Sequence, residues 1–155
     1  MNKFLIIFGI SFILLAAFAL SQNYGQNISF FSKTPKAIIN NQTFDLLLAK
    51  TDKEKALGLS EKQSLPQNSG MLFVFEKPNY YSFWMKEMKL PIDIIFISKN
   101  RIITVYHDVK PPQTPQESLP IYKPEEPADM VLEINAGQAQ KYNLKKGGEV
   151  KFENL

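Results

Sequence analysis

The chain has 155 residues, of which 45% are hydrophobic and 21% are charged, so it is long enough for one packed domain and too apolar for a disordered chain. A net charge of +3, from 18 Lys and Arg residues against 15 Asp and Glu residues, does not indicate nucleic acid as a partner. The lack of cysteine in the sequence excludes disulfides, thiolate metal sites and a cysteine nucleophile, and a single histidine excludes sites that need two imidazoles.

A hydrophobic segment opens the chain. Residues 4–20 carry no charge and follow Lys3. A helix of that length spans about 25 Å, which lies between the core of a signal peptide and a membrane-spanning helix. Two small-x-small sequences that share Ala19 are sites for signal peptidase, so cleavage and retention both stay open. We predict that residues 1–21 are a signal peptide or an N-terminal membrane anchor, and that the rest is secreted or membrane-anchored outside the cytoplasm.

A polar segment and then a folded domain follow. Residues 22–35 are mostly small and polar, which predicts a linker, and the folded domain is predicted over 36–155. The sequence Asn-Asn-Gln at 40–42 predicts a tight turn, since Asn tolerates positive φ. We therefore expect a hairpin between strands at 37–39 and 43–49.

The remaining elements are mostly short strands. Thr51 and Glu54 form a capping-box pattern and Gly58 stands where a helix would end, which predicts a helix over 52–57. We expect a mainly β fold, a jelly-roll-like sandwich or barrel with one or two short helices, whose central strands are covered on both faces. The other predicted strands are 71–75, 80–85, 92–97, 102–107, 128–135 and 149–153, with a second short helix at 138–142.

Four aromatic residues lie within 80–84. Strand alternation would direct Phe83 and Met85 to one face and Trp84 and Lys86 to the other. If the first face fills the core, the indole and the lysine form a stacking surface with a cation, suited to a small carbohydrate or an organic anion. Packing of both faces is the alternative interpretation.

A proline-rich loop is the expected cover for this surface. Residues 110–127 contain six of the ten prolines and no hydrophobic period, which predicts a long surface loop. Tyr122 lies in it, and we expect a partial groove between the loop and Trp84, with Lys86 at its rim.

Asp93 interrupts an otherwise apolar strand. A carboxylate there must be paired or hydrogen-bonded. It either ties the preceding loop to the core through backbone N–H groups or a lysine, or acts in catalysis or ligand binding. Glu87 is the nearest second acid, so a hydrolase with Glu87 and Asp93 as its two carboxyl groups is the alternative function.

Several motifs together resemble the family catalogued as domain of unknown function 192. The resemblance covers about residues 36–152 and implies a compact, mainly β domain, often behind a signal or membrane anchor, with no established activity. Four positions depart from the family pattern. Lys55 and Lys62 replace arginines, which removes a bidentate clamp, and Glu-Met at 87–88 replaces Asn-Thr. The motifs are Lys-Ala-Leu-Gly-Leu at 55–59, Gly-Met-Leu-Phe-Val-Phe at 70–75, Phe-Trp-Met-Lys at 83–86, Leu-Pro-Ile-Asp-Ile-Ile-Phe-Ile at 90–97 and Val-Leu-Glu-Ile-Asn-Ala-Gly at 131–137.

The sequence thus predicts an exported, non-catalytic ligand-binding or accessory module, with the hydrolase as the alternative and a structural domain with a broad apolar patch as a third class. No nucleophile elbow, phosphate-binding glycine loop or dinucleotide fingerprint occurs, so no cofactor and no metal are expected. The expected partners are the membrane, through an uncleaved N-terminal segment, and a small carbohydrate or organic anion. The candidate ligand-binding residues are Trp84, Lys86, Asp93 and Tyr122.

Overall fold

The computed structural model describes residues 33–114 and 117–155, so the predictions for residues 1–21 and for most of the linker lie outside the described residues. The described residues form seven strands and two short helices. In chain order these are β1 (Lys36–Ile39), β2 (Gln42–Ala49), α2 (Asp52–Leu57), β3 (Ser69–Asn79), β4 (Ile92–Ser98), β5 (Arg101–Val109), β6 (Ala128–Asn135), α3 (Gln138–Lys141) and β7 (Lys151–Glu153).

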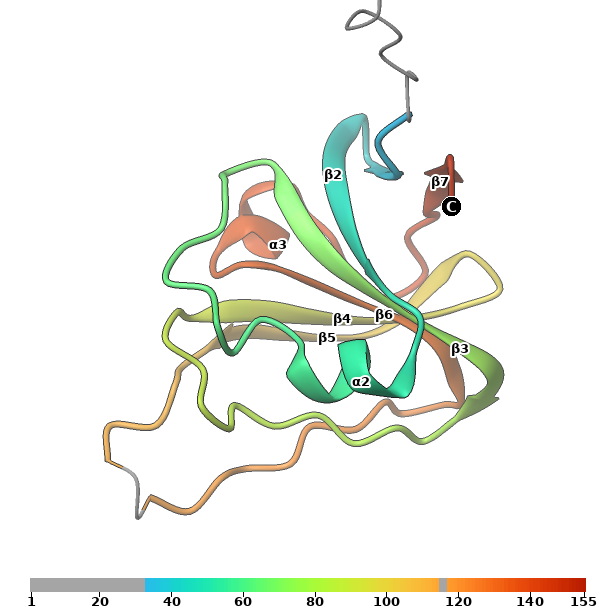
Figure 1. Ribbon diagram of the computed structural model, residues 1–155. Helices are drawn as coiled ribbons and strands as arrows, with labels where there is room; N and C mark the ends of the chain where they lie inside the picture. Colours follow the sequence, from blue (N-terminus) through green and yellow to red (C-terminus); the bar gives the residue numbers. More distant parts are fainter. Residues whose placement is uncertain (1–32, 115–116) are drawn as a thin grey trace, which may run out of the picture. The chain divides into compact units, whose positions relative to one another are not determined.

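The strands form one curled sheet in the order β5-β4-β6-β3-β2-β1-β7 (Figure 1). Strands β2 and β3 pair in parallel, and every other neighbouring pair is antiparallel. The prediction of a mainly β, barrel-type fold with one or two short helices is confirmed. The sheet closes only half of a barrel, because β5 and β7 end the strand order as separate edges.

The predicted hairpin between β1 and β2 is confirmed. Asn40 and Asn41 adopt φ values of 49° and 64°, which is the left-handed region that this turn requires.

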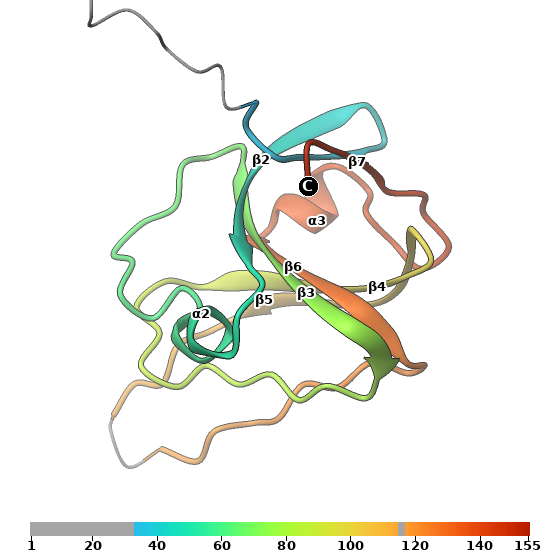
Figure 2. The same ribbon diagram turned by 45° about the vertical axis from the view of Figure 1, so that its right-hand side comes forward.

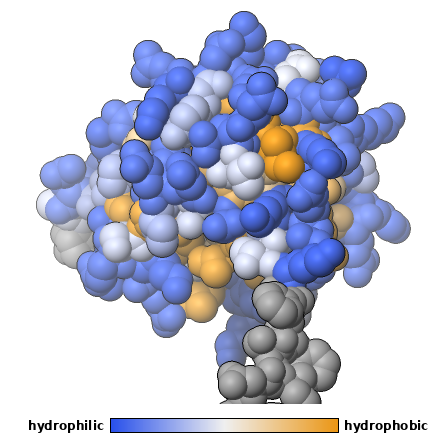
Figure 3. All heavy atoms as spheres, turned by 90° about the horizontal axis from the view of Figure 1, so that it is seen from above, coloured by the Kyte–Doolittle hydropathy of each residue, from blue (hydrophilic) through white to orange (hydrophobic). Residues whose placement is uncertain are grey.

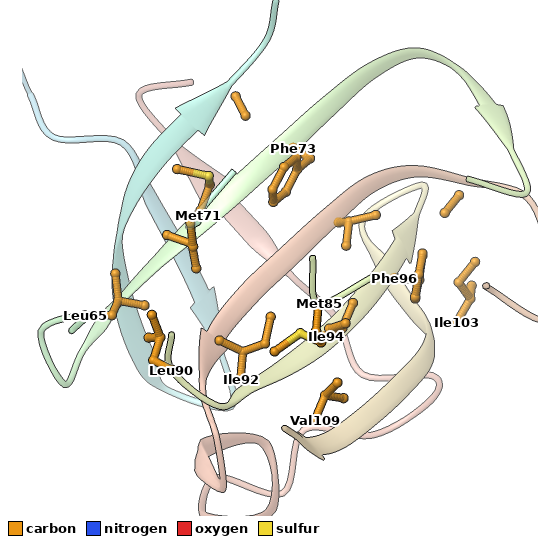
Figure 4. Close-up of a cluster of buried hydrophobic side chains, with 14 residues drawn as sticks. Leu65, Met71, Phe73, Met85, Leu90, Ile92, Ile94, Phe96, Ile103 and Val109 are labelled. Atoms are coloured by element: carbon orange, nitrogen blue, oxygen red, sulfur yellow. The ribbon is translucent and has the colours of Figure 1, made fainter. Parts of the chain in front are cut away.

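The sheet is covered on both faces, which agrees with the apolar runs in β3 and β4. One cluster of buried side chains, which we call the α2 cluster, contains Met71, Phe73, Ile94 and Phe96 and packs beneath α2 and the segment that precedes β4 (Figure 4). A second cluster, on the other face, packs against α3. Figures 1 and 2 show α2 and α3 on opposite sides of the sheet. The α3 cluster is Ala37, Ile39, Phe44, Leu46, Leu72, Ile95, Ile97, Ile102, Leu132, Ile134, Ala139, Leu144 and Val150.

The predicted strand at 80–85 is wrong. These residues form an irregular segment between β3 and β4 that pairs with no strand of the sheet, and Phe83 pairs with Tyr122 in an isolated bridge. The reason is that the aromatic side chains pack on one another and on the α2 cluster, while β6 already occupies the neighbouring position beside β3 and β4. Residues 110–114 and 117–127 form the expected loop, without a helix or strand in their described part apart from the bridge at Tyr122.

Candidate functional site

A pocket of about 450 Å³ opens on the α2 side of the sheet. Its walls come from α2 and the turn after it, from β3, from the irregular segment that precedes β4, and from β6. The volume lies in the range of about 300–1,000 Å³ that is typical of small-molecule sites. We call it the α2 pocket. Its lining includes Lys55, Phe73, Phe75, Tyr81, Phe83, Trp84, Lys86, Glu87 and Glu133.

Helix α2 is held in place by local sequence signals. The Thr51 hydroxyl accepts from the Glu54 N–H at 3.3 Å, and the Glu54 carboxylate accepts from the Thr51 N–H at 2.8 Å, which is the predicted capping box. These backbone hydrogen bonds hold the pKa of Glu54 below its usual value. Gly58 ends the helix at φ 52°. This frame places the Lys55 ammonium 4.8 Å from the centre of the Phe75 ring.

Four aromatic rings make one wall of the pocket. The rings of Phe75 and Tyr81 stack at 3.6 Å, and Phe83 meets Phe73 edge to face at 5.0 Å. The Tyr81 hydroxyl donates to the Lys77 carbonyl at 2.8 Å, which fixes the outer ring. The wall is therefore formed before any ligand arrives, because each ring is positioned by another ring or by the backbone.

Trp84 extends this wall into solvent. Its side chain is 56% exposed and it lines the α2 pocket together with Lys86. Phe83 packs against the α2 cluster and Met85 is 2% exposed, whereas Trp84 and Lys86 point away from the core. These four side chains are therefore divided between core and solvent as strand alternation predicted. The cause is different, because the segment is not a strand.

Glu133 lies on the inner wall of the pocket, in the middle of β6. It is paired across the sheet with Met71 of β3 and Ile94 of β4, so its neighbours in both strands are apolar. The residue is 5% exposed, and its Oε2 atom has no hydrogen-bond partner in the part of the chain that the structure describes. Burial raises the pKa of Glu133 to about 8, so the carboxyl group retains its proton at pH 7.

Charged side chains stand at the rim. Lys86 lies 3.9 Å from the Glu87 carboxylate, and both side chains are more than half exposed. Such an exposed pair contributes about 0–1 kcal/mol, so either partner is free to exchange its contact for a ligand group. Lys55 adds a second cation, whose ammonium lies over the Phe75 ring.

Asp93 lies on the other face of the sheet. It is 0% exposed, and its Oδ1 atom accepts from the N–H groups of Asp108 at 2.8 Å and Gly137 at 3.1 Å. Its Oδ2 atom accepts from the N–H of Ala139 at 2.7 Å, in the first turn of α3. Three backbone donors thus satisfy the carboxylate, which gives Asp93 a structural role. The donors belong to β5 and the start of α3, and not to the loop before β4 that the sequence analysis expected Asp93 to hold.

The alternative pair of hydrolase acids does not come together. Glu87 lines the α2 pocket, whereas Asp93 contacts α3 beneath the opposite face. The apolar residues of β4 lie between the two environments, so Asp93 cannot share a substrate with Glu87.

Tyr122 is not part of the α2 pocket, although its backbone pairs with the neighbour of Trp84 in the chain. Its ring packs edge to face on Tyr106 at 5.0 Å, and its backbone pairs with Phe83. The loop that contains Tyr122 lines a separate hollow beside β5, and none of its residues at 110–114 and 117–127 lines the α2 pocket. The expected groove at Trp84 is therefore bounded by α2 and not by the proline-rich loop, and of the four candidate residues only Trp84 and Lys86 lie together.

Glu133 is the pocket residue that sequence reasoning missed. The signal was present, because this acid interrupts the apolar run of β6 as Asp93 interrupts that of β4. A carboxyl group buried in an apolar strand must be paired, hydrogen-bonded or neutral, and this argument applies to Glu133 as it does to Asp93.

The described residues contain no group of three or more His, Asp or Glu side chains that would hold a metal ion. Among the helices of residues 33–114 and 117–155, none has the length and apolar character needed to cross a membrane. Figure 3 shows one face of the domain, on which small hydrophobic patches are separated by hydrophilic side chains.

Comparison with known proteins gives a family and no activity. A protein of unknown function from Novosphingobium aromaticivorans is 29% identical, with a TM-score of 0.65 over 76% of this chain and 83% of its own. A putative transcription regulator from Sinorhizobium meliloti is 26% identical, with a TM-score of 0.68 over 78% of this chain and 93% of its own. No curated protein shows significant similarity. A family model described as "Uncharacterized ACR" matches residues 35–152, so the chain belongs to the domain of unknown function 192 family.

Proposed function

We propose that the protein is an extracytoplasmic ligand-binding or accessory module whose α2 pocket takes a small carbohydrate or organic anion. The observation that carries the proposal is the pocket itself, which combines a preformed aromatic wall, two rim cations and a buried polar group within about 450 Å³. Aromatic surfaces with a few convergent polar groups are typical of small-molecule sites.

The location outside the cytoplasm is part of this proposal. It rests on the uncharged segment 4–20 and on Lys3 before it, which favour export or anchoring in a membrane. The relative from Sinorhizobium meliloti is described as a putative transcription regulator. The net charge of the present chain is only +3, which favours a small ligand over nucleic acid.

Trp84 makes the proposal testable, because it is the one tryptophan of the chain. The full chain in detergent micelles is titrated with neutral oligosaccharides and with small organic anions while the indole emission is recorded. We expect at least one of these classes to shift or quench the emission in a saturable way.

A matched pair of variants locates the response. Binding is measured by calorimetry for Tyr81→Ala, which removes a ring of the pocket wall, and for Tyr122→Ala, which removes an aromatic ring outside it. Loss of binding only in the first variant supports the pocket. An emission that responds to neither class of compound contradicts the proposed function.

A further inference from the structure

The α2 pocket contains one buried polar group and two cations. Glu133 lies at the inner wall, where its Oε2 atom has no hydrogen-bond partner among the described residues, while Lys86 is exposed and Lys55 is half-buried. A buried polar atom without a hydrogen bond costs about 1–3 kcal/mol, so most buried polar atoms in folded proteins have a partner. The described residues supply no such partner for the Oε2 atom of Glu133. A ligand with a polar group at its inner end would supply that partner.

The aromatic wall between these two ends restricts the shape of the ligand. Phe75 stacks on Tyr81 at 3.6 Å and carries the Lys55 ammonium over its ring, so the face of Tyr81 turned away from Phe75, together with the indole of Trp84, offers a surface for one further flat or chair-shaped ring. A ring that stacks there and still reaches Glu133 must carry a hydroxyl group on its inner edge.

The charges that face Glu133 decide the sign of the ligand. The segment 81–88 contributes Tyr81, Lys86 and Glu87, and α2 contributes Lys55, while the partners of Glu133 in β3 and β4 are apolar. With Glu133 protonated, the two lysines outnumber the single carboxylate of Glu87. The rim therefore favours an anionic group on the ligand.

We infer that the α2 pocket binds a hydroxylated ring acid, with a ring hydroxyl on the Glu133 carboxyl, the ring on the aromatic wall and the ligand carboxylate at Lys86. This inference rests on the proposed function and narrows its ligand class. Two sources carry this chemistry: sugar acids, whose ring is a pyranose, and aromatic hydroxy acids, whose ring is flat.

The first experiment compares matched probes by calorimetry at pH 7. D-glucuronate is compared with D-glucose, and 4-hydroxybenzoate with benzoate and with phenol. In one of these two comparisons we expect the hydroxy acid to bind about tenfold more tightly than the compounds that lack the carboxylate or the hydroxyl. A tenfold loss of affinity corresponds to the loss of one polar contact. The comparison that shows this preference identifies the source.

Two exposed lysines provide the matched control. Lys86→Gln is expected to remove the preference for the acid, and Lys89→Gln, which lies outside the pocket, is expected to retain it. Because Lys86 is exposed, its variant tests the inference without disturbing the core.

The second experiment varies pH from 6 to 9.5, below the usual range in which lysine loses its proton. Ionised Glu133 would repel the ligand carboxylate, so affinity is expected to fall by up to about tenfold per pH unit above pH 8. Glu133→Gln, which keeps a neutral polar group, is expected to bind with no such fall.

The outcomes separate this inference from the proposed function. Neutral sugars that bind as tightly as the acids, or an affinity that is independent of pH in the unaltered chain, would overturn the inference and leave the proposed function standing. A pocket that binds none of the probes, neutral or anionic, contradicts both.

Discussion

Asp93 and Glu133 are buried acids on neighbouring strands that face opposite sides of one sheet. Ile94 of β4 pairs with Glu133 of β6, and Asp93 pairs with Ile134, so the one-residue offset sends the two carboxyl groups to different faces. Asp93 meets three backbone donors, whereas the Oε2 atom of Glu133 has no partner among the described residues. The first acid therefore stabilises the fold, and the second lies in the lining of the α2 pocket with an unsatisfied oxygen.

Removal of the Asp93 side chain is expected to destabilise the protein. Asp93→Ala removes the acceptor of three backbone N–H groups, of which that of Ala139 is buried and the other two are partly buried, and we expect a loss of about 1–3 kcal/mol or more in the free energy of unfolding. Urea denaturation measures it. The control is Asp45→Ala, whose carboxylate is exposed and lies 3.8 Å from Lys36, with an expected cost below about 1 kcal/mol. Equal losses in both variants would contradict the role of Asp93.

Glu133 is expected to make stability depend on pH. Its pKa is about 8 in the folded chain and near the ordinary 4.5 when unfolded, so between these values the folded state holds a proton that the unfolded state has lost. Stability contributed by this group therefore falls as pH rises from about 4.5 to 8, by at most about 1.4 kcal/mol per pH unit.

Glu133→Gln removes this titration. The variant should gain stability relative to the unaltered chain as pH rises from 5 to 8, by an amount on the order of 4 kcal/mol at the upper end. Urea midpoints at several pH values provide the comparison. Glu76→Gln, on the exposed end of β3, serves as the control and should leave the pH profile unchanged. Parallel profiles for Glu133→Gln and the unaltered chain would refute the assignment.

Gly70 is expected to tolerate no side chain. A Cβ atom at this position would lie 2.8 Å from the Glu133 carbonyl oxygen and 2.9 Å from the Leu132 side chain, because β3 and β6 approach closely here. We expect Gly70→Ala to cost about 1–3 kcal/mol through displacement of β6. At Gly147 a Cβ would meet nothing within 4 Å, so Gly147→Ala isolates the backbone cost of its φ of 87°. A Gly70→Ala variant as stable as the unaltered chain would show that β6 yields easily.

The fluorescence of Trp84 is expected to be that of a solvent-exposed indole. Because its side chain is 56% exposed, the emission of the folded chain should lie close to that of free tryptophan, and acrylamide should quench it readily. Trp84→Phe should change the free energy of unfolding by no more than about 0.5 kcal/mol, as is usual for surface positions. An emission typical of a buried indole, resistant to acrylamide, would mean that the segment 81–88 packs differently.

The hydrophobic segment 4–20 is expected to deliver the domain across a membrane. A reporter that is active only outside the cytoplasm, fused at the C-terminus, should be active in the full chain. The same fusion without residues 1–21 should be inactive. Activity solely from a reporter that requires the cytoplasm would contradict export.

Local patterns in the sequence determined most of the individual elements. The hairpin at Asn40 and Asn41, the helix capped by Thr51 and Glu54, and the strands of Ile and Val all depend on residues that are close in the chain, so propensity, capping and alternation suffice to predict them. Family membership also followed from motifs that the sequence displays directly.

Only the tertiary structure decided which residues meet. The aromatic run at 80–85 has strand propensity, yet β6 takes the position between β3 and β4 and leaves the run to pack as a wall. For the same reason Trp84 faces α2 instead of Tyr122, and Glu133 instead of Asp93 lies in the pocket. Strand order brings together residues that are distant in the chain, and alternation along one strand cannot show which neighbour, core or cavity a given face will meet.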